Sequence, residues 1–197
     1  MLALLSGSLA SYNPWISASL GHGSQHERNS LTQLADLQRF IDESRQVRTP
    51  AALENLLADV TREMGFEYYA LIHHVDLSRY NSALSHMVDG NLVALSNYPP
   101  AWVEAYITRN IVADDPVLLA SHRTSVGFKW EDVPKLIRVT AKHRQITEDT
   151  RRAGIADGFT VPAHVPGEAN GSCNFAMGLG RPLPEANLPM AHMVGAY

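Results

Sequence analysis

One stretch of the chain, residues 96–130, collects side chains suited to binding a small molecule. Its aromatic and acidic members are Tyr98, Trp102, Tyr106, Asp115 and Trp130. Trp can only donate a hydrogen bond, ionised Asp can only accept one, and Tyr can donate from a rigid ring. Rings with a few convergent polar groups line small-molecule pockets. For each ring taken singly the alternative is ordinary core packing, because aromatic side chains mostly bury apolar area.

Local signals place these residues on two helices. Two prolines suit the first turn of a helix over about residues 99–109, with Ser96 or Asn97 as its cap. On that helix Trp102 and Tyr106 lie one turn apart on one face. The Asp-Pro pair at residues 115–116 predicts the start of a second, short helix, with the acid as its N-cap.

Composition sets limits on the function. A chain of 197 residues with 45% hydrophobic residues can bury one substantial core, and a net charge of −4 gives no global nucleic-acid signature. The single cysteine, Cys173, excludes an intrachain disulfide and fits a reducing compartment. No apolar run is long enough for a membrane span, so a cytoplasmic protein is expected. No metal and no cofactor is predicted.

The order of elements predicts an α+β fold: one mainly antiparallel sheet of about five strands with helices on both faces. Two helices come first, one capped by Ser30 and running to about residue 47, and one from Thr49-Pro50 to Gly65. The predicted strands cover residues 66–75, 91–96, 125–130, 158–165 and 172–180. An Asp-Gly turn at residues 89–90 precedes the second strand, and a long helix is predicted from about residue 131 to 153.

The last predicted strand has two unlike faces. Alternation places Cys173, Phe175, Met177 and Leu179 on one side. The small or polar residues Ser172, Asn174, Ala176 and Gly178 face the other side. Such a face leaves room for a ligand, although larger residues packed opposite would explain it equally well.

The order of motifs in residues 97–130 resembles the autoinducer-binding domain of LuxR-type quorum-sensing regulators. The matching pieces are Asn97-Tyr98-Pro99-Pro100-Ala101-Trp102, Tyr106, Asp115-Pro116 and Phe128-Lys129-Trp130. The resemblance covers roughly residues 30–197 and implies an α-β-α sandwich. It also implies a ligand, an N-acyl-homoserine lactone, and a function in controlling folding, dimerisation and DNA binding.

The resemblance assigns roles to individual residues. Trp102 matches the family's donor to the lactone carbonyl, Asp115 the acceptor from the amide N–H, and Tyr98 the donor to the acyl carbonyl. Tyr106 and Trp130 match aromatic residues that line the pocket. Two further residues complete the expected site: Val117, bordering the acyl tail, and Asn174, where some members have a small hydroxyl residue.

The resemblance also implies a domain organisation. Residues 1–29 are expected to form a flexible extension, residues 30–184 the autoinducer-binding domain, and residues 185–197 the start of a helix or linker. That linker would lead to a helix-turn-helix DNA-binding domain absent from this chain, through which a homodimer would bind promoter DNA. Two alternatives remain open at this stage: a lactone-processing enzyme, although no Gly-x-Ser-x-Gly elbow is present, and an orphan receptor for another small molecule.

Overall fold

The computed structural model describes residues 25–74, 92–164 and 170–197. The chain divides into two compact units, residues 1–36 and 37–197. The first helix, α1 (Gln25–Ser44), begins five residues before the predicted cap at Ser30. Most of the predicted extension and the predicted turn at residues 89–90 lie outside the described residues, so both stay predictions.

Five strands form one sheet in the order β2-β1-β5-β4-β3, and every neighbouring pair is antiparallel. The strands are β1 (Tyr68–His74), β2 (Leu92–Ser96), β3 (Phe128–Lys129), β4 (Ile155–His164) and β5 (Asn170–Gly178). The long central pair, β4 and β5, is aligned along nearly its whole length, with a β-bulge between Ile155 and Asp157. The prediction of an α+β fold with about five antiparallel strands is confirmed.

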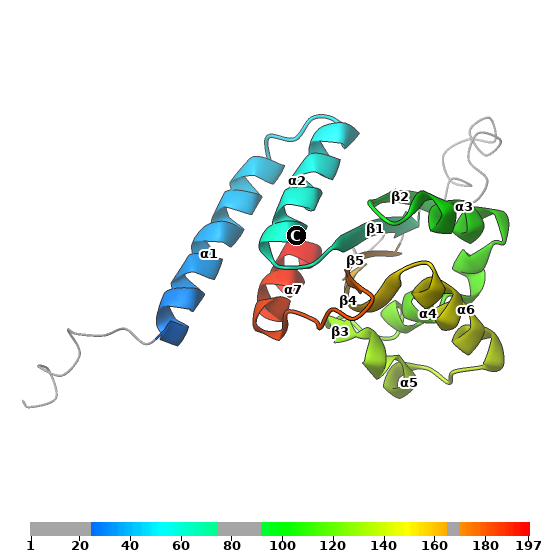
Figure 1. The fold of residues 1–197 in the computed structure, drawn as a ribbon. Helices are drawn as coiled ribbons and strands as arrows, with labels where there is room; N and C mark the ends of the chain where they lie inside the picture. The colour runs from blue at the N-terminus through cyan, green and yellow to red at the C-terminus, as the bar shows by residue number, and fades with distance from the viewer. Residues whose placement is uncertain (1–24, 75–91, 165–169) are drawn as a thin grey trace, which may run out of the picture. The chain divides into compact units, whose positions relative to one another are not determined.

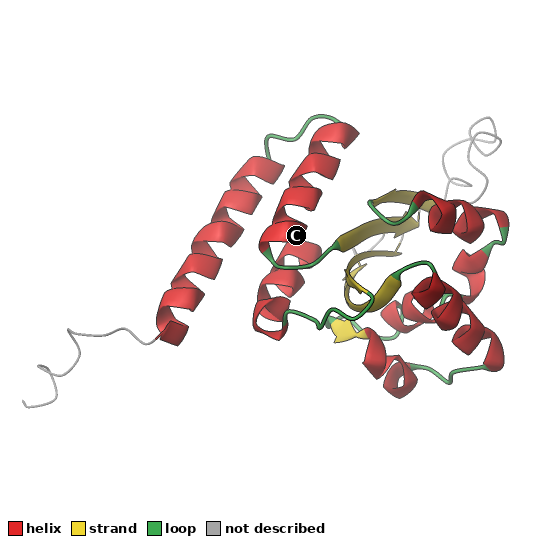
Figure 2. Ribbon diagram, in the orientation of Figure 1, coloured by secondary structure: helices red, strands yellow, loops and turns green. Residues whose placement is uncertain are grey.

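Helices cover both faces of the sheet (Figure 1; Figure 2). One side carries α2 (Pro50–Glu63) and α7 (Leu188–Ala196). The other side carries α3 (Pro100–Thr108), α4 (Pro116–Ser121), α5 (Val133–Leu136) and α6 (Ala141–Arg152). The described residues also include short 3-10 turns: η2 (Ile111–Asp114), η3 (Trp130–Asp132) and η4 (Glu185–Asn187). This arrangement is the expected α-β-α sandwich.

Helix α2 begins and ends as its sequence predicts. The Ala52 N–H donates to Thr49 Oγ1 at 3.2 Å, and Pro50 occupies the first turn, where its missing N–H removes no helical hydrogen bond. Gly65 follows the helix at φ +84°, a left-handed conformation that glycine adopts without steric cost. The strand β1 therefore starts in a defined direction directly after the helix.

The predicted cap of α3 is wrong. The N-cap position is Pro99, whose side chain can neither donate nor accept a hydrogen bond, and Ser96 belongs to β2. The Asn97 side chain instead accepts from the Tyr69 N–H at 2.7 Å and donates to the Glu67 carbonyl at 3.0 Å. Its amide therefore mimics one more backbone pair at the end of β2.

The long helix predicted over residues 131–153 is also wrong, because it is interrupted between α5 and α6. Ile137 is extended at φ −136°, and Thr140 begins a new helix with a reciprocal capping box. The His143 N–H donates to Thr140 Oγ1, and the Thr140 N–H donates to His143 Nδ1, both at 3.2 Å. The polar sequence of this region carries no apolar period that would have located the break.

The main core lies between the sheet and the helices α2 and α7. Its centre is Phe175 of β5, which is fully buried and packs its ring 5.5 Å from that of Phe66. Met177 and Cys173 share this face of β5, as alternation predicts, and α7 contributes Met190 and Val194. The terminal helix is thus part of the core rather than a free linker.

We predict that Phe175→Ala lowers the free energy of unfolding by about 3–5 kcal/mol, because it leaves a cavity in a fully buried position. Urea unfolding followed by far-UV circular dichroism measures the change. Leu179→Ala is the matched control: alternation places Leu179 on the same face, but it follows the end of β5 and is 55% exposed. A loss above about 1 kcal/mol for Leu179→Ala would contradict this account.

Candidate ligand-binding site

The predicted aromatic residues meet in a second cluster, on the sheet face opposite the main core. Trp102 is buried there with Ile111, Ile146, Ile155 and Ala176. Partly buried aromatic rings pack against this centre: Tyr68, Tyr98, Tyr106 and Trp130. Two ring pairs are edge-to-face, Trp102 with Tyr106 and Tyr68 with Tyr98, each with centroids 6.0 Å apart. Tyr68 was not among the residues predicted for the site.

The carboxylate of Asp115 joins this cluster from the start of α4. Its Oδ1 accepts from the N–H groups of Val117 at 2.8 Å and Leu118 at 3.4 Å, as an N-cap does. Its Oδ2 accepts from the Tyr106 hydroxyl at 2.7 Å. The predicted N-cap is therefore confirmed.

The electrostatics of this pair follow from burial. Burial raises the pKa of Asp115 above its ordinary value, and the hydrogen bonds from Tyr106, Val117 and Leu118 oppose that rise. Burial, and then the charge of Asp115, raise the pKa of Tyr106 strongly. Tyr106 therefore remains a hydrogen-bond donor toward the carboxylate at any ordinary pH.

Three polar groups of the cluster have unused hydrogen-bonding capacity. A carboxylate can accept about four hydrogen bonds, and Asp115 accepts three. In the described part of the chain, nothing accepts a hydrogen bond from the Tyr98 hydroxyl or from Trp102 Nε1. Burial, with Asp115 as the second cause, raises the pKa of Tyr98, so its hydroxyl stays protonated. The site thus offers two donors and one acceptor.

A chain of side-chain hydrogen bonds crosses the sheet beside these groups. Trp130 Nε1 donates to Thr160 Oγ1 at 2.9 Å, and Thr160 Oγ1 donates to Asn174 Oδ1 at 2.6 Å. Asn174 Nδ2 then donates to the Ala70 carbonyl at 3.2 Å. Sequence reasoning missed Thr160, because only the register that places it opposite Asn174 reveals the contact.

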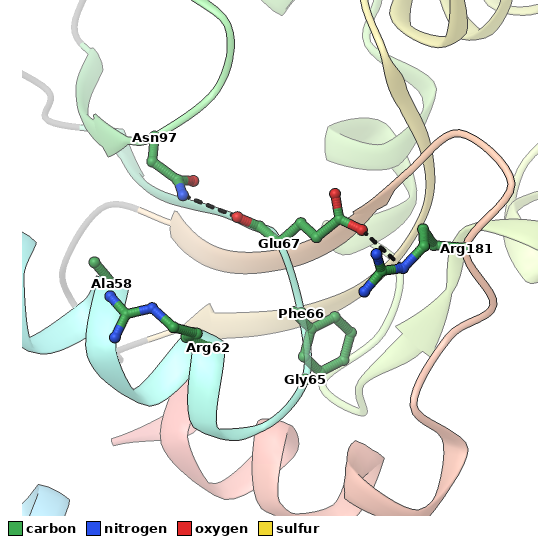
Figure 3. A pocket seen from close by; sticks show the side chains of 7 residues that line it. All are labelled: Ala58, Arg62, Gly65, Phe66, Glu67, Asn97 and Arg181. Atoms are coloured by element: carbon green, nitrogen blue, oxygen red, sulfur yellow. Dashed lines mark hydrogen bonds and ion pairs between the residues drawn. The ribbon is translucent and has the colours of Figure 1, made fainter.

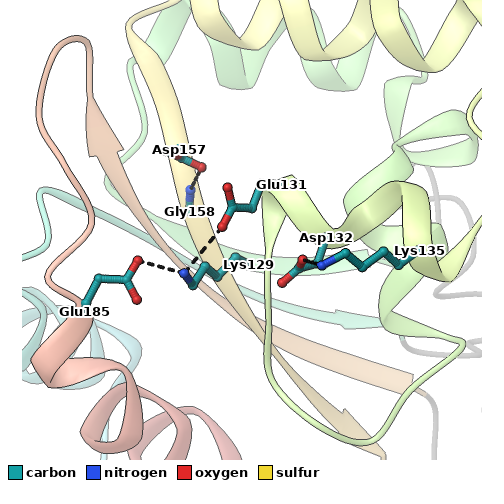
Figure 4. A network of polar contacts seen from close by, with 7 residues as sticks. All are labelled: Lys129, Glu131, Asp132, Lys135, Asp157, Gly158 and Glu185. Carbon is teal, nitrogen blue, oxygen red and sulfur yellow. Dashed lines mark hydrogen bonds and ion pairs between the residues drawn. The ribbon is translucent and has the colours of Figure 1, made fainter.

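The position of Trp130 is fixed from two sides. Its indole lies directly over Gly158, where an added Cβ would come within 2.5 Å of Cε2. The preceding residue, Lys129, donates to Glu185 at 2.7 Å and pairs with Glu131 at 3.4 Å (Figure 4). Trp130 is therefore a fixed wall of the cluster.

Val117 lies elsewhere. Its side chain packs against a third cluster formed by Ala120, Phe128 and Val133, and its backbone N–H is the group that contacts Asp115. Six of the seven predicted site residues therefore belong to the aromatic cluster or to the hydrogen bonds beside it. The seventh, Val117, has its side chain in the third cluster.

A separate surface cleft lies where α2 meets β1 (Figure 3). Its polar lining consists of Arg62, Glu67, Asn97 and Arg181. Glu67 points toward Arg181 and pairs with it at 3.3 Å, whereas Arg62 points away and pairs with Asp59. The two arginines do not converge, so this cleft is not an anion site.

The described residues contain neither a metal site of the usual kind nor a membrane-spanning helix. No group of three or more His, Cys, Asp or Glu side chains within residues 25–74, 92–164 and 170–197 is placed to hold a metal ion. In the same ranges, no helix is both long and apolar enough to cross a membrane.

Comparison with known proteins gives consistent matches. A family model described as the autoinducer binding domain matches residues 49–197. The transcriptional activator LuxR of Aliivibrio fischeri is 25% identical over 141 residues, covering 72% of this chain and 53% of LuxR. The quorum-sensing regulator RhlR of Pseudomonas aeruginosa is 27% identical over 113 residues, covering 56% of this chain and 41% of RhlR. The chain spans about half the length of the curated relatives it matches.

Solved structures share the fold. Escherichia coli SdiA aligns with a TM-score of 0.59 at 24% identity, over 82% of this chain and 63% of SdiA. SdiA in complex with octanoyl-rac-glycerol aligns with a TM-score of 0.64 at 18% sequence identity, over 89% of this chain and 65% of SdiA. CepR2 of Burkholderia cenocepacia aligns with a TM-score of 0.62 at 14% sequence identity, over 83% of this chain and 93% of CepR2. It is described as an N-acylhomoserine lactone dependent LuxR family transcription factor.

We predict that Gly158→Ala destabilises the domain by about 1–3 kcal/mol, because the new methyl group overlaps the Trp130 indole. Urea unfolding of Gly158→Ala, Trp130→Phe and the double variant measures the coupling. The smaller ring should recover part of the loss in the double variant. Strict additivity of the two single changes would show that Trp130 is not what Gly158 accommodates.

The stability of the ligand-free domain should depend on pH through Asp115. Its pKa is raised in the folded state, so the folded state binds the proton more tightly than the unfolded state. The free energy of unfolding therefore falls as the pH rises through the acid range, and Asp115→Asn removes this fall.

The stability difference, variant minus wild type, should grow in favour of Asp115→Asn as the pH rises above about 4, the ordinary pKa of an aspartic acid. Urea unfolding at each pH measures it. Tyr106→Phe removes a hydrogen bond that lowers the pKa of Asp115, so it should steepen the dependence. Parallel curves for all three proteins would contradict the assignment.

Proposed function

The chain belongs to the family of autoinducer-binding domains, and from this membership we propose that it is the sensory domain of a LuxR-type quorum-sensing transcription regulator, with an N-acyl-homoserine lactone as its ligand. The proposal rests on one observation above all. Tyr98 and Trp102, two donors without partners among the described residues, share a cluster with a partly buried acceptor, Asp115, which can accept one more hydrogen bond.

The ligand's head group offers matching chemistry. A lactone carbonyl and an acyl carbonyl can each accept one hydrogen bond, and the amide N–H between them can donate one. We assign Trp102 to the lactone carbonyl, Tyr98 to the acyl carbonyl and Asp115 to the amide N–H. Each assignment gives a hydrogen-bond partner to a buried or partly buried polar group of the protein that is otherwise incompletely bonded, which is the condition for specific polar recognition.

The neighbouring residues support these three contacts. Tyr106 donates to Asp115 and so fixes the carboxylate for the ligand. Trp130 is a wall, held through Thr160. Asn174 retains one amide N–H after bonding to Ala70 and so can donate to the ligand's acyl carbonyl alongside Tyr98. Val117 acts through its backbone, by holding Asp115.

The relatives suggest the wider role. LuxR is a transcriptional activator and RhlR an HTH-type regulator, and both are longer than the stretch they share with this chain. We propose that residues 1–29 form an extension and that residues 30–184 form the sensory domain. Residues 185–197, whose helix α7 also packs into the core of that domain, would lead to a DNA-binding domain. In the cytoplasm, lactone binding would then favour a homodimer that binds promoter DNA.

One solved relative supports a second ligand class. One solved structure is of SdiA in complex with octanoyl-rac-glycerol, which combines an acyl chain with a hydroxyl-bearing head. In this site, a glycerol hydroxyl could donate to Asp115 in place of an amide N–H. Both ligands place an acyl chain in the cluster, so they are distinguished by the head group alone.

We predict that a lactone with a suitable acyl chain raises the free energy of unfolding of the domain by about 2.7 kcal/mol at a ligand concentration 100 times Kd. The melting temperature should rise accordingly. Differential scanning fluorimetry with lactones of graded chain length, and with octanoylglycerol, tests it. Tyr98→Phe and Trp102→Phe should each weaken lactone binding about tenfold, through the loss of one hydrogen bond.

Tyr197→Phe is the matched control, because Tyr197 is 58% exposed and its hydroxyl accepts from Arg45. Its affinity should equal that of the wild type. Absence of stabilisation by every lactone, in a folded sample, would overturn the proposal, and stabilisation by octanoylglycerol alone would transfer it to the second ligand. Mass spectrometry of the released ligand separates a sensor, which returns it intact, from a lactone-processing enzyme.

A further inference from the structure

Ser172 of β5 carries a buried hydroxyl that the site described so far does not use. The residue is 1% exposed, and in the described part of the chain its Oγ has no hydrogen-bond partner. A buried polar group without a partner costs free energy, about as much as a lost hydrogen bond. Native proteins have few such groups, and each calls for an explanation.

The register of the sheet explains why the two neighbouring strands supply no partner for the Ser172 hydroxyl. Ser172 lies opposite Ile72 of β1 and Pro162 of β4. The Ile72 side chain is purely hydrocarbon, and Pro162 has neither an N–H nor a polar side chain. Asn174, two residues further along β5, lies opposite Ala70 and Thr160 and bonds to both.

Alternation places the Ser172 hydroxyl on the ligand side of the sheet. Cys173 and Phe175 belong to the main core on the opposite face, whereas Ala176 belongs to the aromatic cluster. Ser172, Asn174 and Ala176 share one face, because side chains alternate along a strand. Two residues of β5 span about 6.6 Å, so Ser172 lies one pleat beyond Asn174, farther from Ala176.

This position follows the direction of the ligand's chain. The aromatic cluster and Asp115 surround the proposed head group, and Asn174 is at its edge. An acyl chain leaving that head along the polar face of β5 passes Ser172 next. An unsubstituted acyl chain would leave the Ser172 hydroxyl unpaired. An oxygen on the third carbon of the acyl chain would give this hydroxyl a hydrogen-bond partner.

We propose that Ser172 is a specificity-determining residue that hydrogen-bonds an oxo or hydroxyl substituent at the third carbon of the acyl chain. This inference rests on the proposed function, because it presumes an acyl ligand in the aromatic cluster. The ligand class becomes narrower: an oxygen-substituted acyl-homoserine lactone instead of an unsubstituted one.

The test compares matched ligands and matched variants. Eight-carbon lactones that are unsubstituted, 3-oxo or 3-hydroxy are titrated against the wild type, Ser172→Ala and Ser172→Cys by calorimetry. The wild type should prefer at least one oxygenated lactone by about three- to tenfold, the worth of one hydrogen bond. Both variants should lose that preference, because alanine has no hydroxyl and a thiol is a weak donor and acceptor. Their affinity for the unsubstituted lactone should be unchanged or higher.

Thr61→Val is the matched control. Thr61 is also 1% exposed, and its hydroxyl has no partner among the described residues, but it lies on α2, on the other side of the sheet. Its replacement should leave the ligand preference intact. Since Ser172→Ala and Thr61→Val each remove an unpaired hydroxyl, neither should lower the melting temperature of the ligand-free domain.

Each outcome decides a separate point. If no lactone binds the wild type, the proposed function fails. If lactones bind but the wild type shows no preference for oxygenated chains, or if the Ser172 variants lose affinity for all three lactones equally, the role of Ser172 is overturned while the proposed function stands. Ser172→Cys keeps the comparison possible if the alanine variant does not fold.

Discussion

The carboxylate of Asp115 is bonded to two helices at once, and the geometry of the site depends on this double attachment. One oxygen caps α4 and the other accepts from Tyr106 of α3. Since α3 also carries Trp102, the cap of one helix sets where the indole of the other lies. Burial makes the charge costly, and the three hydrogen bonds offset only part of that cost. A fourth donor, supplied by a ligand, would therefore stabilise the folded domain as well as the complex.

The sheet holds the site in place because one of its faces packs in the main core while the other faces the aromatic cluster. On β5, Phe175 and its neighbours anchor the strand in the main core, where packing leaves little freedom. The intervening residues are small or polar and face the aromatic cluster. Asn174 and Thr160 are tied to each other and to Trp130, so the polar groups on this face are positioned by strands and not by loops. Positioning by regular strands keeps hydrogen-bonding groups accurate to within fractions of an ångström.

The sequence predicted those parts of the fold that depend on local chemistry. Thr49, Gly65 and Asp115 act at helix ends as their residue types indicate, because capping needs only neighbouring backbone. One wrong prediction and one missed residue involve partners distant in sequence. Asn97 bonds to β1 instead of capping α3, and Thr160 becomes part of the site only through its register with Asn174. No local pattern encodes such pairings, so they emerge only when the sheet is assembled. The other wrong prediction, an unbroken helix over residues 131–153, overlooked the local capping box of Thr140 and His143.

The terminal helix α7 shares its anchors with one wall of the site. The Gly127 N–H donates to His192 Nδ1 of α7 at 3.2 Å, and Lys129 donates to Glu185 of η4 at 2.7 Å. The first contact comes from the residue before β3 and the second from the last residue of β3, the two-residue strand that leads directly into Trp130. The helix also lies very close to β4, since a Cβ at Gly195 would come within 2.8 Å of Val161. Trp130 cannot shift far without straining these contacts. Any ligand that displaces it therefore acts on the same hydrogen bonds that hold α7 to the sheet.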